Sequence, residues 1–188
     1  MTAAPSDSHI GLVVEGEGDR RAVPVVLRSW LATQGIHEDI LGKPVTCNGR
    51  DKAIMPKGLE GFAAVATSRP GCRGLLVVLD SEGDSVCQLG PELWKRAKSV
   101  TPLPVSVCLA EENYEDWIVA SAETLQLGIE HKTTGGLAAI KKALRPQTYA
   151  KPTWQPRLSA RMDLRLASNR SASFARLLAQ LERLVALM

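Results

Sequence analysis

The first two thirds of the chain alternate between short apolar runs and amphipathic segments. Short aliphatic runs are typical of strands that are covered on both faces of a sheet. Such runs lie near residues 9–15, 74–80 and 104–109, and KPVTC over 43–47 is predicted to be a further short strand. The segments that follow the first three of these four strands have apolar residues at helical spacing, over 20–35, 53–68 and 89–100. This order predicts an α/β fold with a mainly parallel four-stranded sheet and helices on both of its faces.

The remainder of the chain has a mostly helical pattern. An amphipathic helix is predicted to begin at Trp117, and further helices are predicted over 137–144, 158–167 and 173–188. Two prolines indicate an extended segment over 149–157. We therefore expect an α/β domain over residues 1–128 and a mostly helical extension over residues 129–188 that packs on it.

The net charge of +3 conceals an asymmetry between these two parts. Residues 1–128 hold 12 Lys and Arg against 17 Asp and Glu, whereas residues 129–188 hold 11 against 3. An acidic domain joined to a basic extension suits an enzyme that acts on a polyanion. A basic extension also has a simpler interpretation, in which its arginines only keep a surface helix soluble.

Composition also bears on the compartment of the protein. Residues 1–8 have neither the basic nor the apolar region of a secretory signal, and no apolar run approaches the length of a membrane span. The four cysteines form no CxxC pair, and three lie in or beside predicted strands, which favours buried reduced thiols over disulfides or zinc ligands. We expect a cytoplasmic protein that does not enter a membrane.

Acidic residues interleaved with glycine follow two of the apolar runs. The sequence HIGLVVEGEGD ends in Glu15, Glu17 and Asp19, and GLLVVLDSEGD ends in Asp80, Glu82 and Asp84. In α/β proteins the carboxyl ends of parallel strands meet at one edge of the sheet, where sites are usually found. Several carboxylates held together repel one another unless a cation lies between them. Oxygen ligands of this kind suit Mg²⁺ or Mn²⁺.

Some acidic residues also have a purely structural interpretation. Asp19 precedes a predicted helix and is a natural N-cap for it. The segment AEENYEDW after the fourth strand holds Glu111, Glu112, Glu115 and Asp116. Carboxylates stabilise the N-terminus of a helix through its dipole, so we expect at least half of these four to be structural.

The order and spacing of these acids resemble the Toprim domain, which is shared by topoisomerases, bacterial primases, recombination proteins and the overcoming-lysogenization-defect nucleases. Glu15 matches the glutamate at the end of the family's first strand, and Asp80 with Glu82 matches its acidic pair, in which Asp is usual at the second position. Asp19 has the spacing found in the nuclease branch. The resemblance covers roughly the first 125 residues. Beyond them the chain is similar to small bacterial members of the superfamily.

The resemblance implies a Mg²⁺- or Mn²⁺-dependent nuclease of bacterial defence or DNA processing. In it Glu15, Asp80 and Glu82 would bind the metal, and Asp19 and Asp84 would complete or orient the set of ligands. The acidic segment after the fourth strand adds Glu112 and Glu115 as candidate ligands, and the sequence does not choose between them.

Basic residues complete the predicted site. Lys151 is a candidate for stabilising charge on the scissile phosphate, with Arg157 nearby. Arg50 and Lys52 either hold a phosphate or are solvated loop charges. The expected partner is nucleic acid, and DNA is favoured over RNA. The chain contains no G-x-x-x-x-G-K-[ST] motif, so the alternative function is a non-catalytic or conditionally active subunit that works with a separately encoded ATPase.

Overall fold

The computed structural model describes residues 8–131 and 135–188. The segment examined for a secretory signal lies almost wholly outside the described residues. The strands are β1 (His9–Val14), β2 (Val45–Thr46), β3 (Cys72–Asp80) and β4 (Val105–Ala110). They form one parallel sheet in the order β2-β1-β3-β4, which confirms the predicted α/β architecture.

The register of the sheet aligns the carboxyl ends of its central strands. Val14 of β1 pairs with Val78 of β3, and Asp80 at the end of β3 pairs with Ala110 at the end of β4. The residues that follow β1, β3 and β4 therefore leave the sheet at the same edge. The acidic segments that follow β1 and β3 therefore lie side by side, and the acidic segment that follows β4 lies next to the one that follows β3.

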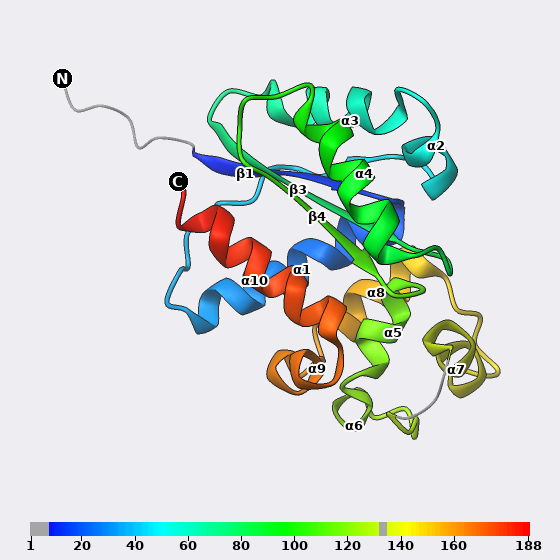
Figure 1. Cartoon of the computed structure of the whole chain (residues 1–188). Helices are drawn as coiled ribbons and strands as arrows, with labels where there is room; N and C mark the ends of the chain where they lie inside the picture. The colour runs from blue at the N-terminus through cyan, green and yellow to red at the C-terminus, as the bar shows by residue number, and fades with distance from the viewer. Residues whose placement is uncertain (1–7, 132–134) are drawn as a thin grey trace.

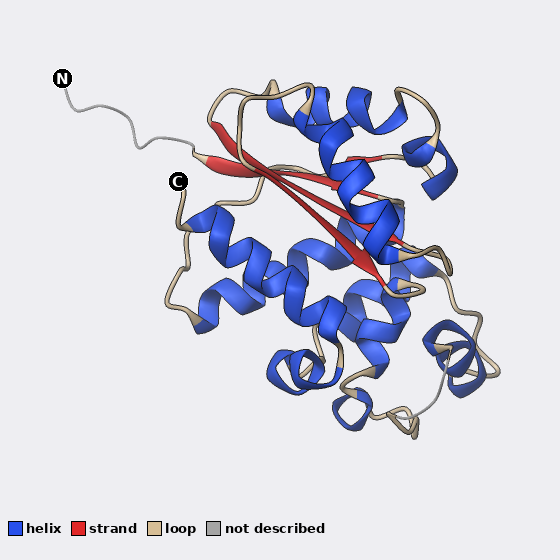
Figure 2. Cartoon of the chain, viewed as in Figure 1, coloured by secondary structure: helices blue, strands red, loops and turns tan. Residues whose placement is uncertain are grey.

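Helices cover both faces of the sheet, as Figures 1 and 2 show. The helices α3 (Gly58–Thr67) and α4 (Val86–Lys98) lie on one face, with the short helix α2 (Arg50–Ile54) beside α3. The helices α1 (Glu17–Thr33) and α10 (Ala172–Val185) cover the other face. Each face buries its own apolar cluster, because alternate strand residues point to opposite sides of the sheet.

The C-terminal helices share the larger of these two cores. They comprise α5 (Tyr114–Val119), α6 (Ala122–Leu125), α7 (Gly136–Ala143), α8 (Lys151–Ser159) and α9 (Leu164–Arg170), followed by α10. Leu158, Phe174 and Leu181 are fully buried in one cluster with residues of β1 and β3. Residues 136–188 thus complete the covering of one face of the sheet.

Four predicted segments differ from the structure. The helix expected to begin at Trp117 begins at Tyr114, and the segment is divided between α5 and α6. The single helix expected over 53–68 is broken at Met55, whose ψ of 153° is extended because the next residue is Pro56. The segment 149–157, expected to be extended, is mostly the helix α8, because its first proline lies in the first helical turn, where backbone N–H groups have no intrahelical partner. The helix expected over 158–167 is divided between the end of α8 and α9.

Within the described parts of the chain, every helix is too short or too polar to cross a lipid bilayer.

Candidate active site

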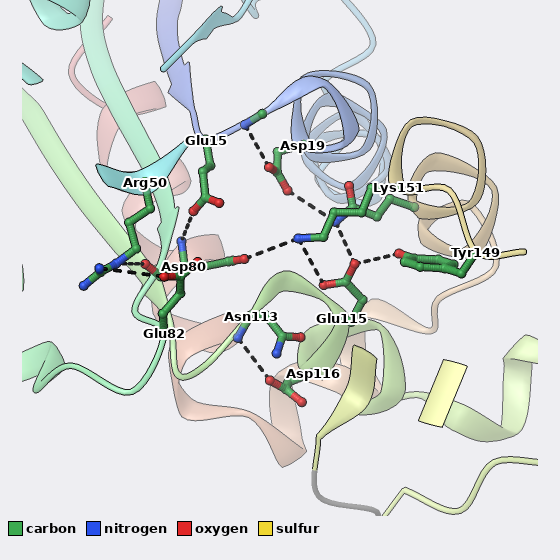
Figure 3. A network of polar contacts seen from close by, with 12 residues as sticks. Glu15, Asp19, Arg50, Asp80, Glu82, Asn113, Glu115, Asp116, Tyr149 and Lys151 are labelled. Carbon is green, nitrogen blue, oxygen red and sulfur yellow. Dashed lines mark hydrogen bonds and ion pairs between the residues drawn. The ribbon is translucent and has the colours of Figure 1, made fainter. Parts of the chain in front are cut away.

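Four acidic residues and one lysine meet at the carboxyl edge of the sheet, as Figure 3 shows. Glu15 follows β1, Asp19 lies in the first turn of α1, Asp80 ends β3, and Glu115 lies in the first turn of α5. Lys151 is the first residue of α8. We call these five residues the carboxylate cluster.

Glu15 and Asp80 are direct neighbours because β1 and β3 are paired up to this edge. The backbone N–H of Asp80 donates a hydrogen bond of 3.2 Å to Oε2 of Glu15. The Asp80 side chain is buried, and no hydrogen bond from the described residues reaches its carboxylate oxygens. The sequence correctly predicted that these two acids would lie together.

Asp19 has a different structural role from the one predicted. The helix α1 begins at Glu17, and the N-cap position is occupied by Gly16, which is extended with φ −144°. Asp19 is therefore the third residue of the helix, and its Oδ2 accepts a 3.0 Å hydrogen bond from the backbone N–H of Gly16. This reciprocal bond fixes one oxygen and leaves Oδ1 directed into the cluster.

Glu115 is fully buried in the cluster. Its Oε1 accepts a 2.6 Å hydrogen bond from the hydroxyl of Tyr149 and a 3.1 Å bond from Nε2 of Gln155. Its Oε2 accepts no hydrogen bond from the described residues. Gln155 also donates to Oδ1 of Asp19, at 3.4 Å, and thereby connects two of the acids.

Lys151 supplies the positive charge among these carboxylates. Its Nζ lies 3.8 Å from Oδ2 of Asp80 and 3.8 Å from Oε2 of Glu115. The position of Lys151 depends on close packing of α8 against α1 at Gly18. A Cβ atom on Gly18 would lie 1.9 Å from Oε1 of Gln155 and 2.9 Å from Cβ of Lys151. Only glycine allows this approach.

Burial and mutual repulsion shift the acids toward their neutral forms. Burial, followed by the charges of Glu15 and Asp19, raises the pKa of Asp80 to about 9 despite the nearby ammonium. Burial likewise raises the pKa values of Glu15 and Asp19. For Lys151, burial opposes the charged form, but the surrounding carboxylates outweigh it and raise its pKa. Four ionised carboxylates would exceed the charge of a single ammonium, and the raised pKa values reduce this excess by favouring protonation.

A cavity of about 410 Å³ opens beside the cluster. It is lined by Asp80, Glu82, Gly83, Glu112, Asn113, Leu137 and Lys151. Both partners of the Lys151–Asp80 ion pair therefore face an accessible space. A ligand in this cavity would meet the carboxylate of Asp80 and the ammonium of Lys151, together with the exposed carboxylates of Glu82 and Glu112.

The other predicted acids lie outside the cluster. Glu82 and Asp84 are exposed and pair with Arg50, whose NH1 lies 3.9 Å from Oε2 of Glu82. Glu82 has a positive φ of 49°, so the chain turns sharply after Asp80. Glu112 is exposed and lines the cavity without joining the cluster. Of the two candidates after β4, the structure places Glu115 in the cluster.

Arg50 and Asp116 have supporting roles. Arg50 is 8% exposed, and its Nε donates a 3.1 Å hydrogen bond to the backbone carbonyl of Asp80. It is therefore neither a solvated loop charge nor a free phosphate ligand, and it holds the turn after β3.

Asp116 accepts hydrogen bonds from the backbone N–H of Asn113, at 3.1 Å, and of Gly136, at 2.6 Å. As expected for part of the acidic segment, Asp116 is structural, while the exposed side chain of Glu111 has no ionic partner among the described residues.

The donor set is compatible with a divalent cation bound mainly through water. Residues 8–131 and 135–188 contain no group of three or more His, Cys, Asp or Glu side chains arranged to hold a metal ion. Mg²⁺, however, commonly keeps several waters and uses only one or two carboxylates of the protein. The Glu15–Asp80 pair meets that requirement, and the Asp80 carboxylate is free of hydrogen-bond donors from the described residues.

Sequence reasoning missed two residues of the site. Tyr149 and Gln155 hold Glu115, and neither belongs to a motif or follows a strand. Gln155 lies one helical turn after Lys151, which places both on one face of α8. That relationship required α8 to be recognised as a helix, and its prolines indicated otherwise.

Comparison with known proteins adds no further information about this site. The chain matches no protein-family model, no curated protein and no solved structure. The Toprim resemblance therefore remains a prediction from short motifs.

Proposed function

We propose that the protein is a divalent-metal-dependent phosphodiesterase that hydrolyses nucleic acid. The observation that carries this proposal is the adjacency of Glu15 and Asp80, of which Asp80 also faces the cavity. Asp80 is buried, has a pKa of about 9 and accepts no hydrogen bond from the described residues, so a bound cation would strongly stabilise its ionised form.

In this proposal Glu15 and Asp80 hold Mg²⁺ or Mn²⁺. The metal supplies Lewis acidity toward a phosphoryl oxygen and lowers the pKa of a bound water. Lys151 lies on the cavity wall, where its ammonium stabilises negative charge that develops on a phosphodiester. Glu115, held by Tyr149 and Gln155, keeps the ammonium in place.

The deciding experiment combines metal-dependent melting with a cleavage assay. Wild type in Mg²⁺ or Mn²⁺ is expected to melt at a higher temperature than without metal and to cleave a labelled DNA or RNA substrate. Glu15→Gln and Asp80→Asn keep side-chain shape and remove a charge, so both are expected to abolish the metal shift and cleavage. Glu111→Gln, which removes an exposed acid outside the cluster, is the matched control and is expected to behave as wild type.

The variant Glu82→Gln distinguishes the ligand set that the family resemblance implies from the one that the structure favours. The family resemblance makes Glu82 a metal ligand, whereas its pairing with Arg50 predicts that metal binding survives the change. Absence of any metal-dependent shift in the wild type would refute the proposal. A metal shift without cleavage by the isolated chain would favour the alternative function, a conditionally active subunit that needs a separately encoded ATPase.

Contact with nucleic acid is tested by salt dependence. Arg157 is exposed and its guanidinium lies 5.6 Å from the centre of the Trp154 ring, on the same helix as Lys151. If Arg157 contacts a phosphate, Arg157→Gln should reduce the slope of log affinity against log salt by about 0.7 to 0.9. An unchanged slope would exclude Arg157 from the nucleic-acid interface.

A further inference from the structure

The strand β4 forms an open edge of the sheet, away from the carboxylate cluster. The carbonyls of Pro104 and Ala110 accept hydrogen bonds from Leu75 and Ser81, so the even-numbered positions of β4 face the strand β3. Backbone groups alternate in direction along a strand, and Val105, Val107 and Leu109 therefore direct their N–H and C=O groups outward. Val107 is the partly exposed residue of the three, whereas Val105 and Leu109 are buried, so a strand that pairs with this row has to enter between the helices on either side of the edge.

A groove runs along this edge, between α4 on one face of the sheet and α10 on the other, as their positions in Figure 1 indicate. Its volume is about 370 Å³. The α4 wall is mainly apolar and includes Val86, Pro91 and Trp94, whose large side chain is 42% exposed. The floor is formed by β4 itself.

The opposite wall of the groove is positively charged. Arg176, Gln180 and Arg183 of α10 line it, and both arginines are exposed without an ion-pair partner among the described residues. Seven residues of helix separate the two arginines, which is about 10 Å along α10. That distance lies between the lengths of two and four residues of an extended chain, the spacings at which side chains share one face of a strand.

One outward group of β4 already has a partner. The indole N–H of Trp94 donates a 3.0 Å hydrogen bond to the carbonyl of Val105. For Val107 and Leu109 the described residues provide no such partner. The unpaired part of the edge therefore lies beyond Trp94, next to the arginine wall.

We propose that the groove along β4 binds an extended acidic segment of a partner protein as a fifth strand. Main-chain hydrogen bonds to Val107 and Leu109 provide affinity, as in other cases of strand addition. Side chains on one face of the added strand contact the apolar α4 wall, and acidic side chains on the other face contact Arg176 and Arg183. The occupant is therefore a chain that alternates between acidic and β-branched or apolar residues.

The same features argue against other occupants. A nucleic-acid backbone would use the arginines, but it has no regular N–H and C=O groups to pair with a strand edge. A second copy of β4 would place the two arginine walls close together, and like charges oppose that contact. An acidic peptide satisfies the backbone groups, the charges and the apolar wall together.

The test uses a synthetic peptide, fluorescein-labelled TEVEVET, with the full chain and fluorescence anisotropy. Its glutamates share one face and its valines share the other. Saturable binding is expected. The charge-reversed peptide TKVKVKT and a TEVEVET peptide with alternate backbone nitrogens methylated are each expected to bind about tenfold more weakly or not at all.

Two variants locate the site on the protein. Arg176→Gln combined with Arg183→Gln is expected to weaken TEVEVET binding about tenfold, because two exposed charges contribute together about 1.4 kcal/mol. Lys141→Gln combined with Arg165→Gln removes the same charge from other exposed positions and is expected to have no effect. Val107→Pro removes an N–H that faces outward, so it is expected to abolish binding without breaking the β3–β4 ladder.

Cys87 provides an independent measurement. It lines the groove and is exposed, whereas Cys47, Cys72 and Cys108 are buried. Alkylation of Cys87 is expected to slow when TEVEVET saturates the protein. Failure of TEVEVET to bind, equal binding of TKVKVKT, unaltered binding to the double arginine variant, or unprotected Cys87 would each overturn the proposal. So would displacement of the peptide by a single-stranded oligonucleotide, or a dimer in solution that Val107→Pro dissociates.

Discussion

The ammonium of Lys151 lies 3.8 Å from Oδ2 of Asp80, although Asp80 ends a strand of the sheet and Lys151 begins a helix much later in the chain. It is the only cationic group of the described residues within ion-pair distance of that carboxylate. The same ammonium lies 3.8 Å from Glu115, so one positive charge is shared between two buried acids. The cluster is therefore short of positive charge, and its stability should depend on pH, on Lys151 and on added cations.

The first prediction concerns pH. Asp80 has a folded-state pKa of about 9, well above its ordinary value of 3.8, so folding favours its protonated form. Its contribution to stability is complete at low pH and is lost as pH rises toward 9. Without metal, the free energy of unfolding should fall between about pH 5 and pH 9, by up to about 1.4 kcal/mol per pH unit from this group. Urea denaturation at several pH values measures the slope.

Two variants test the assignment of that slope. Asp80→Asn removes the titrating group and should flatten the dependence. Asp39→Asn is the control, because Arg28 lowers the pKa of Asp39 and that group does not titrate in this range. Equal slopes for wild type and Asp80→Asn would show that Asp80 does not control the pH dependence.

The second prediction concerns Lys151. Lys151→Met keeps much of the aliphatic side chain but removes the charge that two carboxylates share. We expect a loss of about 1 to 3 kcal/mol without metal near pH 10, where Asp80 is ionised, reduced from the value for a fully buried pair because Lys151 is 37% exposed. The loss should be smaller near pH 5, where Asp80 is protonated. Under the proposed function, Mn²⁺ should raise the melting temperature of this variant more than that of the wild type.

Lys141→Met is the matched control for that change, because Lys141 is exposed on α7 and has no ion pair within the described chain. It should leave stability unchanged at both pH values. A loss for Lys151→Met that is independent of pH would indicate that the aliphatic part of the side chain, and not its charge, stabilises the fold.

The third prediction compares the hydroxyls of two tyrosines, Tyr149 and Tyr114. Tyr149 donates to the carboxylate of Glu115 at 2.6 Å, whereas the hydroxyl of Tyr114 lies 2.8 Å from that of Ser159. Hydrogen bonds to charged groups are the stronger class. Tyr149→Phe should cost about 1.5 to 3 kcal/mol and Tyr114→Phe about 0.5 to 1.5 kcal/mol. Chemical denaturation of both variants checks the order, and the reverse order would mean that the bond from Tyr149 to Glu115 is not the stronger of the two.

The fourth prediction concerns the contact between α1 and α8. Gly18→Ala places a Cβ against Gln155 and Lys151, so it should cost about 1 to 3 kcal/mol and displace Lys151 from the acids. Gly61→Ala is the control, since Gly61 lies in α3 with open space around it and alanine favours the helix there. That variant should gain up to about 1 kcal/mol. Thermal melting should show a lower melting temperature for Gly18→Ala and a higher one for Gly61→Ala. Equal changes in melting temperature would contradict the close approach of α1 and α8.

The sequence by itself determined the sheet and the first part of the site. Each strand is a local aliphatic run, and the register of a parallel sheet follows once those runs are buried on both faces. Glu15 and Asp80 directly follow two such runs, so their proximity needed only the parallel arrangement. The acidic character of the cluster was therefore predictable from local pattern alone.

Tertiary structure alone decided which further side chains enter the cluster. Glu82 is directed to Arg50 by a positive φ that no local pattern indicated, and Glu115 is chosen over Glu112 by hydrogen bonds from Tyr149 and Gln155. Lys151 reaches the acids because α8 is a helix that lies against Gly18, more than a hundred residues away in the chain. Contacts of such sequence separation depend on how helices pack, and the residue pattern of either helix by itself does not contain that information.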